Sequence, residues 1–125
     1  MTNVRVDANG VPKAPVYDST APLAHRSAVT AVDGADPAEA AGIDTSGYEE
    51  CRLDLNLTGT GLTSLEVQAL FWNARQGVWF GGGKYTFTAT GRYSLCVACR
   101  GQKTFLKVTA FSGTSFSLNA DSCLS

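Results

Sequence analysis

The second part of the chain, from Cys51 onwards, alternates between apolar and polar residues, which is the pattern of strands with one buried face. The first two alternating runs are separated by Thr58–Gly61, whose glycines and threonines predict a turn. The inward-facing side chains are expected to be Leu53, Leu55 and Leu57 in the first run, and Leu65, Val67, Ala69 and Phe71 in the second. The alternation therefore predicts a sheet with one face on a core and the other in water.

Five further strands are expected, at 78–80, 85–89, 93–99, 104–111 and 115–120. The turns between them are rich in small and polar residues, and the three consecutive glycines at 81–83 must bend or bulge the chain. About seven strands with a turn roughly every 8–12 residues are typical of sandwiches and small barrels. The predicted fold class is all-β: an antiparallel β-sandwich or a small jelly-roll-like barrel.

The composition of residues 1–48 predicts an extended N-terminal arm, which precedes a predicted β-sandwich domain at 49–125. The arm holds all 4 prolines and only 2 of the 12 aromatic residues, which is too little apolar material for a core of its own. One short strand is expected near 27–32. A short helical turn is expected near 37–41, because Asp36 can cap it, Pro37 suits its first position and Gly42 ends it.

The arm is either a solvated tail or a segment that packs on another surface. Its scattered apolar residues favour packing, and Tyr17 and Leu23 are candidates for an interface. Residues 1–50 carry 3 basic and 8 acidic side chains, net −5, whereas residues 51–125 carry 7 basic and 3 acidic, net +4. The two parts should attract each other, within one subunit or between subunits. We expect residues 1–35 to serve assembly more than folding of the β region.

Composition excludes several classes of protein. The net charge of −1 argues against a dedicated nucleic-acid binder. No stretch approaches the roughly 20 apolar residues of a membrane span, and the first ten residues lack the apolar segment of a signal peptide. We therefore expect a protein made in the cytoplasm, with no membrane and no nucleic-acid partner.

The sequence lacks a recognisable set of catalytic residues. The only histidine, His25, lies in the arm, and the β region has only three acidic residues: Asp54, Glu66 and Asp121. No spacing among these acids suggests a pair flanking a cleft, and charges on the wet face of strands explain Asp54 and Glu66. We expect a protein that is not an enzyme and has no catalytic residue and no cofactor.

Four cysteines raise the question of a metal or redox site. Cys96 and Cys99 form a CxxC pair inside a predicted strand, where residues three apart point to opposite faces. They cannot both bind one ion unless the strand breaks, so we expect no metal and no redox role. The alternatives are a zinc site completed by Cys51 and Cys123, or a Cys51–Cys123 disulfide.

The two tryptophans are further candidates for an interface. Trp72 lies on the face opposite Phe71, and Trp79 on the face opposite Phe80, while Phe71, Phe80, Phe87 and Phe116 are expected core residues. One tryptophan should then face outwards, where it could stack on a sugar or fill a pocket in a partner. The other interpretation is a tryptophan covered by the protein's own arm.

Four segments together resemble a known class of proteins. They are Asp36–Tyr48, Glu66–Asn73, Gly77–Trp79 and Thr104–Gly113. Over residues 36–125 the chain resembles the small, β-rich virion proteins of tailed bacteriophages, found as capsid decoration (cement) proteins or as neck and tail accessories. The resemblance carries no catalytic motif and assigns no functional residue.

The resemblance implies a non-enzymatic role in the virion. Decoration proteins of this kind form homotrimers and use arms to clamp neighbouring capsomers, so the implied partners are further copies of the chain and the major capsid protein. The alternatives are a neck or tail accessory, or a carbohydrate-binding module on the virion surface that uses Trp72 or Trp79 on surface glycans.

Overall fold

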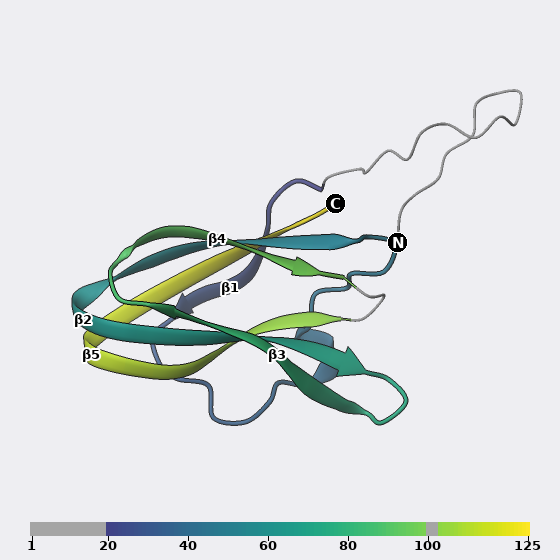
Figure 1. The fold of residues 1–125 in the computed structure, drawn as a ribbon, viewed down its shortest axis with the longest axis horizontal. Coiled ribbons are helices and arrows are strands. Elements are labelled where there is room, and N and C mark those ends of the chain that lie inside the picture. Colours follow the sequence, from purple (N-terminus) through teal and green to yellow (C-terminus); the bar gives the residue numbers. More distant parts are fainter. Residues whose placement is uncertain (1–19, 100–102) are drawn as a thin grey trace, which may run out of the picture.

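The computed structural model describes residues 20–99 and 103–125, and this part of the chain is all-β (Figure 1). Its five antiparallel strands belong to one sheet: β1 (Leu23–Val29), β2 (Glu50–Asn73), β3 (Val78–Phe87), β4 (Gly91–Ala98) and β5 (Thr104–Leu124). A 3₁₀ turn, η1 (Glu39–Ala41), is the one helical element of these residues. None of them forms a helix long and apolar enough to cross a membrane. The all-β antiparallel prediction is confirmed.

From residue 50 onwards the described residues form four strands, β2 to β5, where seven were expected, because three predicted turns lie inside continuous strands. Residues 58–61 belong to β2, 81–83 to β3 and 112–113 to β5. Gly59 and Gly113 have φ angles of 151° and 138°, and a Cβ on either would collide with the backbone of the paired strand. These glycines therefore bend the two long strands without ending them.

The sheet order is β1-β5-β2, and the two halves of β2 then have different neighbours. The first half pairs with β4, from Glu50 opposite Ala98 to Leu57 opposite Gly91. The second half pairs with β3, from Leu65 opposite Phe87 to Asn73 opposite Val78. In Figure 1, β2 and β5 turn back together at one end of the molecule.

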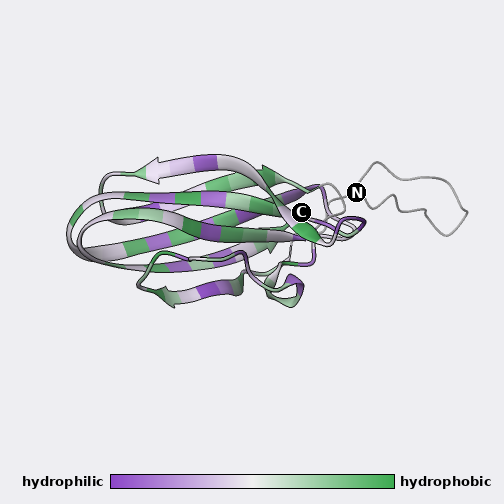
Figure 2. Cartoon of the chain, turned by 90° about the horizontal axis from the view of Figure 1, so that it is seen from below, coloured by the Kyte–Doolittle hydropathy of each residue, from purple (hydrophilic) through white to green (hydrophobic). Residues whose placement is uncertain are grey.

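We call the two parts of this folded sheet the first half-sheet (β1, residues 115–124 of β5, residues 50–60 of β2, and β4) and the second half-sheet (residues 104–112 of β5, residues 62–73 of β2, and β3). One hydrophobic cluster draws on both of them. Its fully buried members include Leu53, Leu57, Leu65, Val67, Leu106, Val108 and Leu118. The expected inward faces of both alternating runs are thus confirmed, and Figure 2 shows the alternation along the strands.

Strand β3 corrects one expected core residue. Phe80 is 47 % exposed, whereas Trp79 is only 8 % exposed. The pairing skips from Gln68 opposite Lys84 to Leu70 opposite Gly81, so the glycine run forms the expected bulge. Trp79 pairs with Trp72 and is buried in a second cluster, separate from the main core. Phe80 pairs with the half-buried Phe71, which packs against the main core, but Phe80 itself stays exposed near the end of an edge strand.

The described part of the predicted arm lies on the protein's own sheet. We call residues 20–45 the strap. Its strand β1 begins four residues before the expected strand at 27–32 and pairs with β5, from Leu23 opposite Ser122 to Val29 opposite Leu118. Ile43 forms a bridge with Thr104. These contacts lie within one chain, which is one of the two ways in which the arm and the β region were expected to attract each other.

The expected helical turn is present at 39–41, inside the predicted range, but its capping differs. Ala38 is the N-cap and no side chain caps the turn. Asp36 instead forms an ion pair with Lys107 of β5 at 2.9 Å. An acid of the strap thus binds a base of the β region, which is the attraction that the uneven charge predicts.

Candidate functional site

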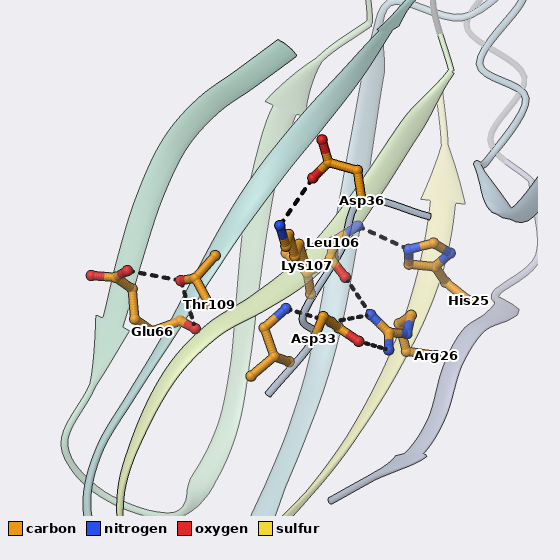
Figure 3. A network of polar contacts seen from close by, with 9 residues as sticks. His25, Arg26, Asp33, Asp36, Glu66, Leu106, Lys107 and Thr109 are labelled. Atoms are coloured by element: carbon orange, nitrogen blue, oxygen red, sulfur yellow. Dashed lines mark hydrogen bonds and ion pairs between the residues drawn. The ribbon is translucent and has the colours of Figure 1, made fainter. Parts of the chain in front are cut away.

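Residues 104–108 of β5 have β2 on one side only, so their other edge presents backbone groups that need partners. The strap supplies these partners, as Figure 3 shows. His25 Nε2 accepts a hydrogen bond from the Leu106 N–H at 3.0 Å, and Arg26 Nη1 donates one to the Leu106 carbonyl at 2.8 Å. Asp33 Oδ2 accepts from the Val108 N–H at 2.8 Å, and the Asp33 N–H donates to the Val108 carbonyl at 2.9 Å. Side chains and backbone groups of the strap thus close an edge that a strand would otherwise cover.

Arg26 and Asp33 hold the centre of this edge network. Two hydrogen bonds of 2.9 Å join the guanidinium to the carboxylate, and the two side chains are 15 % and 22 % exposed. The guanidinium carbon also lies 4.7 Å from the centre of the Phe105 ring. Burial raises the pKa of Asp33, but the hydrogen bonds from Arg26 and the Val108 N–H outweigh it and hold that pKa below its ordinary value.

His25 is held in its neutral form. Its ring contacts Phe105 edge-on, with centroids 5.1 Å apart. Because Nε2 accepts a hydrogen bond, the proton of the neutral ring is on Nδ1. Burial, and secondly the positive charge of Arg26, lower the pKa of His25 from 6.5 to about 4.

The first prediction concerns pH. Because the pKa of His25 is lowered in the folded protein, the unfolded chain binds more protons between about pH 6.5 and pH 4. The contribution of His25 to stability is full above pH 6.5 and is lost as the pH falls towards 4, a loss of at most about 3 kcal/mol. Urea titrations at pH 7, 6 and 5 should show the unfolding free energy decreasing.

The control is His25→Gln, which keeps an acceptor for the Leu106 N–H but cannot be protonated. Its unfolding free energy should change little between pH 7 and 5. The pKa values of Asp33, Asp44 and Asp54 are lowered from 3.8, so these carboxylates affect stability only in more acidic solution. Equal slopes for the two proteins would contradict the assignment to His25.

The four interface candidates do not lie together. Trp72 and Trp79 are opposite each other on β2 and β3, with ring centroids 5.2 Å apart. Leu23 lies on β1, in the first half-sheet, and is 62 % exposed. Tyr17 lies outside the described residues.

Both tryptophans belong to a second apolar cluster with Leu70 and Phe105. The strap covers Trp79, whose Nε1–H donates a hydrogen bond to the Pro37 carbonyl at 2.8 Å. Trp72 is half-buried and lines a recess of about 320 Å³ together with Glu39, Asp44, Ser46, Asn73, Ala74 and Lys103. Trp79 is therefore the tryptophan covered by its own strap, and Trp72 keeps contact with an open recess.

The outer face of the first half-sheet carries a regular array of polar side chains. We call it the polar face: Arg52, Asp54 and Asn56 of β2, Arg92 and Ser94 of β4, and Asn119 and Asp121 of β5. Pairing aligns them in rows across three strands, Asp121–Asp54–Ser94 and Asn119–Asn56–Arg92. These residues line a recess of about 590 Å³.

Sequence reasoning did not find the polar face, because it treated Asp54 as a solvated charge. The available signal was the alternation of polar residues in each of three strands. That alternation shows which residues share a face of one strand, but the rows depend on pairing between residues as far apart as Asp54 and Asp121.

The cysteines lie as the strand argument predicts. Cys96 is exposed and Cys99 is buried, and none of the four cysteines is in a disulfide. Cys51 pairs with Leu124, whereas Cys123 pairs with Arg52, so these two thiols are out of register with each other. Burial, with a smaller effect of neighbouring thiols, raises the pKa of Cys51 to about 12. Among the described residues, no group of three or more His, Cys, Asp or Glu is placed to hold a metal ion.

Comparison with known proteins gives no match to a family model, to a curated protein or to a solved structure.

Proposed function

We propose that this chain is a non-enzymatic structural protein of a bacteriophage particle, specifically a capsid decoration (cement) protein. In this proposal it is made in the host cytoplasm, needs no cofactor, and joins the virion as a homotrimer that contacts the major capsid protein. It binds neither nucleic acid nor membrane.

The observation that carries the proposal is the folded sheet. The ribbon of β2 and β5 bends once, and its two half-sheets enclose one hydrophobic cluster. We describe this arrangement as a jelly-roll-like sandwich, an architecture that recurs in viral capsid proteins. Because a fold alone does not determine function, the resemblance of residues 36–125 to phage virion proteins supplies the second support.

Strand β3 offers a surface suited to subunit contacts. It is an edge strand of the second half-sheet, paired with β2 on one side. Val78 and Phe80 are large apolar residues on it, 45 % and 47 % exposed. An edge strand with exposed apolar side chains favours association with another chain.

The second prediction is the copy number of the chain in purified particles. A cement protein occupies sites repeated over the whole head, so quantitative mass spectrometry should find hundreds of copies per particle. Major capsid protein measured in the same digest provides the reference. A dozen copies or fewer would exclude the decoration role and favour a neck or tail accessory.

A carbohydrate-binding module on the virion surface is the second candidate. The recess beside Trp72 favours it, because an aromatic wall with nearby polar groups can hold a sugar. Trp79 does not support it, since Pro37 and the strap cover that ring.

A further inference from the structure

We propose that the polar face of the first half-sheet binds neutral oligosaccharides. This site differs from the recess beside Trp72, and the proposal does not depend on a role in the virion. It rests on the shape of the polar face, on its unused hydrogen-bonding groups and on its balance of charge.

The shape of the polar face follows from the lengths of its side chains. Short side chains (Asp54, Asn56, Ser94, Asn119 and Asp121) fill the middle of three adjacent strands, and the long Arg52 of β2 and Arg92 of β4 lie at opposite ends of the array. The resulting recess of about 590 Å³ is in the range of small-molecule sites. It lies on the two central strands, β2 and β5, and on β4, so paired backbone holds its floor.

Part of the hydrogen-bonding capacity of this recess is used within the protein. Asp54 accepts from Ser94 at 2.8 Å and pairs with Arg52 at 3.0 Å. Asn119 Oδ1 accepts from the Ala28 N–H at 2.9 Å, which leaves its NH₂ group as a donor for a ligand. These contacts fix the orientation of several side chains before any ligand arrives.

The remaining groups are directed to solvent. The side chains of Asn56, Arg92 and Asp121 make no hydrogen bond or ion pair with another described residue. They supply an amide, a guanidinium and a carboxylate within one recess. Hydroxyl groups both donate and accept, so adjacent hydroxyls of a sugar can bind a carboxylate and a guanidinium at the same time.

The balance of charge favours an uncharged ligand. Arg52 and Arg92 match Asp54 and Asp121, so these four side chains sum to zero. Asp121 also lies directly opposite Asp54, and like charges opposite each other in a sheet reduce stability. The carboxylate of Asp121 can accept hydrogen bonds from ligand hydroxyls beside Asp54. The same negative charge would repel an anionic polymer.

The experiment uses the purified full-length chain. An array of neutral hexose and N-acetylhexosamine oligosaccharides identifies a binder, and titration calorimetry measures its affinity, with polygalacturonate as the anionic probe. We expect at least one neutral oligosaccharide to bind. Asp121→Ala and Arg92→Ala should each weaken it at least about tenfold, because each removes a hydrogen bond to a charged group.

Two variants serve as controls, with thermal melts to show that every variant is folded. Trp72→Ala removes the wall of the other recess, and Arg75→Ala removes an exposed positive charge in the turn between β2 and β3. Both should bind like the wild type. The proposal is overturned if no neutral oligosaccharide binds, if only polygalacturonate binds, or if Trp72→Ala abolishes binding while Asp121→Ala and Arg92→Ala do not.

Discussion

Removal of residues 1–35 is expected to abolish the cooperative unfolding transition of the remaining chain. The deletion exposes the edge of β5 at Leu106 and Val108 and removes the partners of their backbone groups. It also removes β1 from the edge of the first half-sheet. The combined loss should exceed about 5 kcal/mol, which is comparable with the whole stability of a small domain.

Circular dichroism melts of the truncated and full-length chains test this expectation. The truncated chain should melt without a clear transition, or aggregate through its open edge. Asp33→Ala in the full-length chain should cost about 3–5 kcal/mol, because it leaves the charge of Arg26 and the Val108 N–H without a partner.

The matched control is Glu39→Ala, which removes a more exposed strap ion pair with Lys103 at 3.4 Å. Its effect should be below about 1 kcal/mol. A truncated chain that melts cooperatively near the temperature of the full-length chain would show that the strap is dispensable for folding.

The second large effect is expected for Trp79→Ala, which should lower the unfolding free energy by about 3–5 kcal/mol. Trp79 is buried between the strap and the second half-sheet, and it donates a hydrogen bond to the Pro37 carbonyl. Its ring also lies against Gly42, at which a Cβ would approach the ring to 2.7 Å. The substitution Trp79→Ala therefore removes both the packing of the indole ring and the hydrogen bond that attaches the strap.

Two variants separate these contributions in urea titrations. Trp79→Phe keeps an aromatic ring but loses the hydrogen bond. Trp72→Ala truncates the neighbouring ring, which is half-buried and makes no hydrogen bond among the described residues. Both should cost less than Trp79→Ala. If Trp79→Ala were no more costly than Trp72→Ala, Trp79 would not anchor the strap.

The strands themselves could be predicted because their cause is local. Leu53, Leu55 and Leu57 repeat with a period of two, and that period alone places them on one face. Glycine was harder to interpret, because the same residue ends one strand and bends another. Gly59 and Gly113 bend strands that remain paired, which became clear only from their pairing partners.

Features that depend on distant partners could not be predicted. The edge network joins His25 and Arg26 to Leu106 across about eighty residues of sequence, and no local pattern marks such a contact. The burial of Trp79 depends on the strap that covers it, and the exposure of Phe80 depends on its place on an edge strand. Charge gave partial information: it predicted attraction between the arm and the β region, but not the pairs Asp36–Lys107 and Glu39–Lys103.

The most direct test of the proposed virion role is electron cryo-microscopy of purified particles of the phage to which this proposal assigns the chain. The proposal predicts density on the outside of the head, repeated at local three-fold positions, into which residues 20–125 fit as the folded sheet with its strap. Particles that lack this density on the head, neck and tail, and lack the chain by mass spectrometry, would contradict a role in the virion.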